Sequence, residues 1–206
     1  MFGYFLLGIT YAFAASVQPG PFQTYLISQT ISNGWKNSLP AAFAPLLSDG
    51  PIILIVLLVL SHIPASLSLG LQAAGGIFLL YLAIGAYRNW LHFNTDNPIH
   101  KQSVRLTTIK AALVNLLNPN PWLAWSLVMG PLLIKGWREE PINGISLLAG
   151  FYSTMIIVTI IIMLLFSIAR NLGNQVSRAL IGISAIAMAC FGLYELWMCL
   201  KAILQI

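Results

Sequence analysis

Two short stretches decide how this chain folds. Gln18–Phe22 has the sequence Gln-Pro-Gly-Pro-Phe, and Asn118–Trp122 has the sequence Asn-Pro-Asn-Pro-Trp. Each lies inside an apolar segment of about 30 residues, which as one straight helix would be roughly 45 Å long, against a bilayer core of about 30 Å. Proline inside a helix removes a backbone donor and clashes with the preceding turn. We therefore predict that both segments are membrane-spanning helices broken at their proline clusters.

The composition around these stretches is that of a membrane protein. Hydrophobic residues make up 58% of the 206 residues and charged residues only 7%, whereas soluble domains carry about 25% charged residues. Six apolar segments lie between the charged positions, at about 2–31, 39–60, 69–91, 106–134, 142–169 and 179–200. We predict an all-α membrane protein with six transmembrane helices, forming a single transmembrane domain over residues 1–206 that leaves no room for a soluble domain.

The two halves of the chain resemble each other. The proline clusters lie 100 residues apart, and two further pairs of short motifs match in the same order. These are Gly34-Trp35-Lys36 with Gly136-Trp137-Arg138, and Gly85-x-Tyr87-x-x-Trp90 with Gly192-x-Tyr194-x-x-Trp197. Repeat one covers about 1–95 and repeat two about 104–206. Since each repeat has three spans, the second must cross the membrane in the opposite sense, which predicts the inverted repeats of many secondary transporters.

The basic residues predict the orientation. Seven of the ten lie on one side of the predicted spans and three on the other; the seven are Lys36, Arg88, Lys101, Arg105, Lys110, Arg170 and Arg178, and the three are Lys135, Arg138 and Lys201. The positive-inside rule places the side with seven in the cytoplasm and both termini outside, in a bacterial-type inner membrane. The net charge of +5 then reflects topology, and we expect the lipid bilayer, not nucleic acid, as the partner of this basic chain.

Asp49 is the acidic residue that the predicted spans place near the middle of the membrane. An aspartate at that depth costs roughly 2.5–3.5 kcal/mol on insertion scales. Carboxylates there usually face the bundle interior and bind ions, protons or substrate amines. Glu195, by contrast, lies close to Trp197 and Lys201, and we interpret it as an interfacial carboxylate at the outer end of the last span.

A binding site is predicted where the two breaks meet Asp49. The helix that restarts after each break directs its positive dipole end and free N–H groups at the break, which attracts an anion such as a carboxylate. Asp49 would bind a cationic amine, sodium or a proton. The predicted substrate- or ion-binding residues are Gln18, Pro19, Gly20, Pro21, Asp49, Asn115, Asn118, Pro119, Asn120 and Pro121, with Gln23 as a further neutral partner. This arrangement suits a zwitterion such as an amino acid.

The order of these motifs resembles the LysE/RhtB family of small bacterial amino-acid exporters over nearly the whole chain. The matching residues are Gly20-Pro21, Gly34-Trp35 leading to Leu39-Pro40-Ala41-Ala42, Asp49-Gly50 and Asn118-Pro119. The resemblance implies six helices in two inverted repeats, export of amino acids or related small metabolites, and a proton or ion gradient as the driving force. It also implies functional roles for Gly20, Pro21, Asp49, Asn118 and Pro119.

Other functions remain open at this point. The chain could be the substrate-binding membrane subunit of a multi-component importer, or an ion or metal exporter of the same superfamily. An intramembrane protease is not predicted, because the three histidines lie in predicted loops and Gly144 stands where a Glu-Glu-x-x-x-Arg motif needs arginine. We expect no enzyme activity, no bound cofactor beyond a coupling proton or sodium ion, and no metal site. A homo-oligomer is compatible with the sequence.

Overall fold

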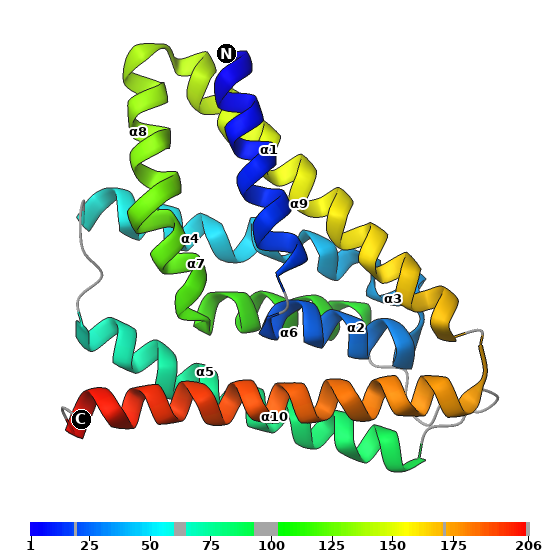
Figure 1. The fold of residues 1–206 in the computed structure, drawn as a ribbon. Coiled ribbons are helices and arrows are strands. Elements are labelled where there is room, and N and C mark those ends of the chain that lie inside the picture. The colour runs from blue at the N-terminus through cyan, green and yellow to red at the C-terminus, as the bar shows by residue number, and fades with distance from the viewer. Residues whose placement is uncertain (19, 60–64, 93–102, 171, 205–206) are drawn as a thin grey trace.

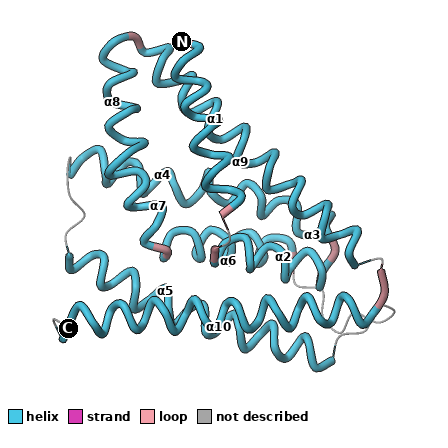
Figure 2. The backbone as a smooth tube through the Cα atoms, in the orientation of Figure 1, coloured by secondary structure: helices cyan, strands magenta, loops and turns pink. Residues whose placement is uncertain are grey.

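The computed structural model describes residues 1–18, 20–59, 65–92, 103–170 and 172–204, and within these ranges it contains helices and no strand (Figures 1 and 2). The prediction of an all-α protein is confirmed. In chain order the helices are α1 Phe2–Val17, α2 Pro21–Asn33, α3 Trp35–Ser38, the 3₁₀ helix η1 Leu39–Phe43, α4 Ala44–Val59, α5 Ala65–His92, α6 Val104–Leu117, α7 Pro119–Ala124, the π-helical turn η2 Trp125–Met129, α8 Gly130–Glu139, α9 Pro141–Arg170 and α10 Asn174–Leu204. Pro19 and Lys101, which the sequence analysis singled out, lie outside the described residues.

Within the described residues, four helical stretches are long and apolar enough to cross a membrane. They are Trp35–Leu58, Leu69–His92, Pro141–Ala169 and Asn174–Leu204, and they coincide with the predicted second, third, fifth and sixth spans. Large apolar side chains on these stretches are more than half exposed, among them Leu54, Leu58, Leu165, Ile168 and Ile186. An exposed apolar surface of this extent is typical of contact with a membrane. The predicted first and fourth spans are instead divided into shorter helices.

The first division separates α1 from α2. Gln18, at the C-terminal end of α1, is extended (φ −62°, ψ 122°), and so is Gly20 (φ −152°, ψ 178°), at which α2 begins. Pro21 is the first residue of α2, the position where its fixed φ suits a helix and its missing N–H is no loss. The chain turns sharply between the two helices (Figure 1), so α1 and α2 point in different directions, as the sequence predicts.

The second division separates α6 from α7. Asn118 is extended (φ −79°, ψ 126°), and Pro119 begins α7 directly after it. Pro121 lies within the first turn of α7, so the helix continues past it through η2 into α8. The chain again changes direction at this point (Figure 2). The predicted break is therefore present, and Pro119, not Pro121, starts the new helix.

The helices form two close pairs with two short helices between them. In Figure 1, α1 lies beside α9 in the upper part, α5 lies beside α10 along the bottom, and α2 and α6 lie between these pairs. Glycines permit the close approach: a Cβ on Gly76 of α5 would lie 2.8 Å from the carbonyl oxygen of Gly192 on α10. Small residues at helix contacts are typical of membrane bundles, where van der Waals packing drives association.

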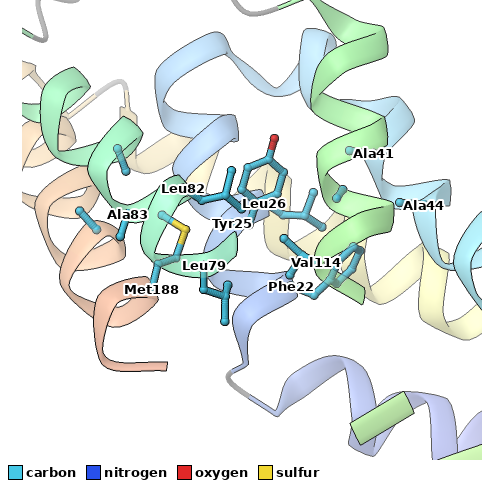
Figure 3. Packing of buried hydrophobic residues seen from close by; sticks show 13 residues of the cluster. Phe22, Tyr25, Leu26, Ala41, Ala44, Leu79, Leu82, Ala83, Val114 and Met188 are labelled. Carbon is cyan, nitrogen blue, oxygen red and sulfur yellow. The ribbon is translucent and has the colours of Figure 1, made fainter. Parts of the chain in front are cut away.

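The two larger of three clusters of buried apolar side chains among the described residues hold this arrangement together. In the first, Phe22, Tyr25 and Leu26 of α2 pack against Leu79 of α5 and Met188 of α10, as Figure 3 shows. The second joins α1, α4, α8 and α9 with α7 and η2; its buried members include Ala12, Ile52, Trp122, Trp125, Met129, Leu133, Leu147 and Phe151. Each break lies in sequence between residues of different clusters. The first break separates Ala12 of the second cluster from Phe22 of the first, and the second break separates Val114 of the first cluster from Trp122 of the second.

Candidate functional site

The two helix breaks border one cavity of about 840 Å³, called the central cavity below. Its wall is built from α1, α2, α4, α6, α7, η2, α9 and α10. Its lining residues are Tyr11, Ala15, Gln18, Gly20, Pro21, Phe22, Gln23, Pro45, Asp49, Asn115, Asn118, Asn120, Pro121, Ala124, Trp125, Met129, Phe151, Met155, Ala187, Cys190, Phe191, Tyr194 and Glu195. A volume of this size is in the range of small-molecule sites, which measure about 300–1,000 Å³.

The structure brings most of the predicted site residues together at this cavity. Eight of the ten line it: Gln18, Gly20, Pro21, Asp49, Asn115, Asn118, Asn120 and Pro121. Pro119 is buried in the first turn of α7 and does not line the cavity, while Pro19 lies outside the described residues. Residues 97 positions apart in the sequence, such as Gln18 and Asn115, therefore border the same space.

Asp49 is the most deeply buried charged group of the cavity. Asp49 is 2% exposed. Its carboxylate accepts hydrogen bonds from Asn115 Nδ2 at 2.9 Å and from the Tyr152 hydroxyl at 3.4 Å. The side chain of Trp125 is a further hydrogen-bond partner. Neutral donors stabilise a carboxylate only in part, because they carry no net charge. Asp49 is thus held in place by α6, α9 and η2, yet it forms no ion pair among the residues that the structure describes.

Asn115 acts as the anchor of this carboxylate. Its Nδ2 donates to the Ser48 hydroxyl at 2.8 Å as well as to Asp49. The Ser48 hydroxyl in turn donates to the backbone carbonyl groups of Ala44 and Pro45. The donors of Asn115 are therefore engaged with α4. This geometry favours a positioning role for Asn115 over the direct substrate contact that the sequence analysis allowed.

At the second break, the side chain of Asn118 caps the start of α7. Asn118 Oδ1 accepts from the backbone N–H of Asn120 at 3.0 Å. Pro119 and Pro121 have no N–H to offer, so the first three residues of α7 present no free donor to an anion. The expectation of an anion-attracting helix start therefore does not hold at this break, because the prolines and the cap remove the N–H groups on which it depends.

The first break is different. Gly20 precedes α2 without a side-chain cap, and Phe22 and Gln23 in the first turn carry backbone N–H groups, which in the first turn of a helix lack intrahelical partners. The side chain that bridges this break is Gln23, whose Nε2 donates to the carbonyl oxygen of Ser16 at 3.3 Å. Gln18, one of the predicted binding residues, lines the cavity.

Glu195 also borders the central cavity, which the sequence analysis did not predict. It is 8% exposed and lines the cavity, whereas the sequence analysis described it only as an interfacial carboxylate. After Glu195, α10 continues to Leu204, nine residues further, which is about 13 Å of helix. Trp197 and Lys201 lie on that extension, and Trp197 is 57% exposed. The extension of α10 past Leu200 could have been found from the apolar residues Ala202, Ile203 and Leu204.

Sequence reasoning also missed the aromatic wall of the cavity. Tyr11, Trp125, Phe151, Phe191 and Tyr194 line it from α1, η2, α9 and α10. Trp125 and Phe151 meet edge to face, with their ring centroids 5.5 Å apart. Tyr152, next along α9, supplies the hydroxyl that reaches Asp49. No sequence signal identified these residues, because aromatic side chains are common throughout the apolar segments.

Comparison with known proteins identifies the family of this chain. A model of the LysE type translocator family matches residues 13–198, which includes both breaks, Asp49 and Glu195. No curated protein and no solved structure matches. This family is one of translocators and not a class of enzymes. The chain therefore belongs to the LysE type translocator family, and it is a multi-pass membrane transporter.

Proposed function

We propose that this protein is a secondary exporter of amino acids or related small zwitterions, and that the central cavity is its substrate site. One observation carries the proposal: a buried carboxylate and an uncapped helix start border the same cavity. A zwitterion has one group for each, because its amine is a cation and its carboxylate an anion. The residues proposed for binding are those of the sequence analysis that line the cavity, with Asp49 at the centre and Asn115 in the positioning role described above.

In this proposal Asp49 binds the substrate amine. Its carboxylate is oriented by Asn115 and Tyr152 but lacks a cationic partner among the described residues. Attraction between unit charges about 4 Å apart is roughly 4 kcal/mol at an effective dielectric of 20. Half of this attraction energy would change the affinity for the substrate by more than tenfold. Asp49 is therefore expected to make the largest single contribution to substrate binding. Trp125, beside it, also offers an aromatic face to a cation.

The start of α2 binds the substrate carboxylate. The N–H groups of Phe22 and Gln23 lie where the helix dipole is positive, and both residues line the central cavity. Gly20, immediately before them, has no side chain to shield these groups. The second break contributes differently, since Asn118 and the two prolines cover the start of α7. Substrate recognition would therefore depend on the first break more than on the second.

We further propose six membrane spans in two inverted repeats within one domain, residues 1–206. The divided helices α1–α2 and α6–α8 would each form one span, and the breaks at equivalent positions support this assignment. So does the packing of α5 against α10, the last helix of each proposed repeat. The basic residues favour the bacterial inner membrane, with both termini outside. Movement of one repeat against the other would then expose the cavity to each side in turn.

The experiment is substrate counterflow in liposomes. Purified protein is reconstituted with a panel of proteinogenic L-amino acids inside and the same radiolabelled amino acids outside, under imposed proton or sodium gradients. Gradient-dependent exchange of at least one amino acid supports the proposal and identifies the coupling ion. Binding in detergent without exchange would instead indicate a subunit of a multi-component importer, and exchange of inorganic cations alone would indicate an ion exporter. Either result would overturn amino-acid export.

A further inference from the structure

The central cavity contains a second buried carboxylate, Glu195, and its surroundings differ from those of Asp49. Asp49 accepts hydrogen bonds from Asn115 and Tyr152. Glu195 is 8% exposed and, within the part of the chain that the structure describes, it forms no hydrogen bond and no ion pair with another side chain. One carboxylate is thus fixed by neutral donors, while the other is buried without a protein partner.

The groups packed around Glu195 cannot neutralise it. In addition to the central cavity, Glu195 borders a small void. The other walls of this void come from α2, α5, α6 and the second break, and their residues are Pro21, Gly75, Phe78, Leu79, Val114, Leu117 and Asn118. None of these residues carries a charge or titrates. The remaining titratable groups that line the central cavity are Asp49, Tyr11, Tyr194 and Cys190, and none of them is a cation at neutral pH.

An ionised carboxylate in such a place is unfavourable without a counter-charge. It must bind a proton, which makes it neutral, or hold a cation from the medium. Among the described residues, the lining of the central cavity contains no lysine, arginine or histidine, so with both carboxylates ionised these residues would carry two negative charges and no positive one. The counter-charge for Glu195 therefore has to come from solution, in the form of a small cation that can enter and leave.

We propose that Glu195 is a second cation-binding residue of the central cavity, which takes up a proton or a sodium ion from solution. The inference rests on the proposed function, because it assigns the coupling cation of that transporter to a named residue. Asp49, held by its neutral donors, is the fixed charge for the substrate amine. Glu195, to which no described residue donates a hydrogen bond, binds the exchangeable cation.

The test compares Glu195→Gln with the wild type in detergent, without any amino acid. Melting temperature is measured at mildly acidic and mildly alkaline pH, in sodium chloride and in choline chloride of equal concentration. The wild type should melt differently across these conditions, since a ligand that binds the folded state stabilises it. In Glu195→Gln, the change in melting temperature that comes from cation binding at residue 195 should be absent. Glu140→Gln is the matched control, because Glu140 is an exposed carboxylate outside the cavity.

The arms of this experiment separate the two cations. A response to pH that is the same in sodium and choline identifies the proton, and a response to sodium at constant pH identifies sodium. An identical response in the wild type and Glu195→Gln overturns the proposal. Because no amino acid is present, this result is independent of the counterflow assay: amino-acid exchange can fail while Glu195 binds a cation, and the reverse also holds.

A second measurement decides the question if Glu195→Gln does not fold. Dicyclohexylcarbodiimide is an apolar reagent that modifies carboxyl groups in their protonated form, and peptide mass spectrometry locates the modified residue in the wild-type protein. We expect Glu195 to be modified, with less modification at alkaline pH and, if sodium is the cation, less in sodium than in choline. Absence of modification at Glu195, or modification that neither pH nor sodium changes, overturns the proposal.

Discussion

Asn115 Nδ2 lies 2.9 Å from Asp49 Oδ1, and the same nitrogen lies 2.8 Å from the Ser48 hydroxyl. Asn115 is three residues before Asn118, where α6 ends, so the hydrogen bond ties the buried carboxylate of α4 to the segment that precedes the second break. A change in the direction of α6 at this break would move Asn115 and alter the position of Asp49 with it. Asn115 thus couples the position of the Asp49 carboxylate to the second break.

The first prediction concerns the charge of Asp49. Asp49→Asn retains the shape and the hydrogen-bonding capacity but removes the Coulomb attraction, so amino-acid counterflow should fall by more than about tenfold. Folding should be retained, because an amide costs less than a carboxylate at membrane depth. Flux and a melting curve are measured on the same preparation, with Glu140→Gln as the control. Wild-type flux in Asp49→Asn would contradict the role in binding.

Asn115→Leu tests the anchor. The substitution leaves Asp49 with one donor fewer, and interhelical hydrogen bonds in membranes contribute roughly 0.6–2 kcal/mol. We expect weaker substrate binding together with a lower melting temperature. Ser48→Ala is the matched control, since it removes the other acceptor of Asn115 and leaves the contact with Asp49. If Ser48→Ala reduces substrate binding as much as Asn115→Leu does, the hydrogen bond between Asn115 and Asp49 is not the cause of the loss.

Asn118→Ala tests the cap of α7. Loss of a side-chain cap typically costs about 0.5–2 kcal/mol, and here it would also release the N–H of Asn120. The melting temperature should fall in Asn118→Ala and recover in Asn118→Asp, because aspartate accepts the same hydrogen bond. Equal melting temperatures for Asn118→Ala and the wild type would show that the extended conformation of residue 118 is maintained by the prolines alone.

Gly76→Ala tests the contact between α5 and α10. The new Cβ would lie 2.8 Å from the carbonyl oxygen of Gly192 and 2.7 Å from Leu196 Cγ, and such overpacking typically costs about 1–3 kcal/mol. Gly85→Ala, on the same helix, has no atom within 4 Å of the new Cβ and should leave the melting temperature unchanged. Similar melting temperatures for the two variants would mean that the two helices are not closely packed at Gly76.

The orientation is tested with single cysteines in a Cys190→Ser/Cys199→Ser background. Asn97→Cys lies in the segment between the predicted third and fourth spans, and we expect it to be shielded from membrane-impermeant thiol reagents in intact cells. Glu140→Cys lies between α8 and α9 and should react. Both should react once the membrane is permeabilised. The reverse pattern in intact cells would invert the orientation without affecting the repeat.

The sequence by itself determined the class of protein and the positions of the breaks. Low charge and high apolar content leave only a membrane as solvent. Two prolines separated by one residue favour a break in a helix, because each removes a backbone donor and clashes with the preceding turn. These are local properties, so no tertiary information is needed. Asp49 was identifiable for a related reason, because a charge inside an apolar segment is costly wherever the helix packs.

The tertiary structure decided which side chains meet across the cavity and what each one contributes. Asn118 and Gln18 occupy equivalent places in the sequence repeat, yet only Asn118 caps a helix, and at the first break Gln23 makes the bridging bond instead. Glu195 faces the cavity because the contact between Gly76 and Gly192 sets how α10 lies against α5. Such pairings depend on the relative position of helices distant in sequence, and helical periodicity does not encode that position when apolar residues cover every face.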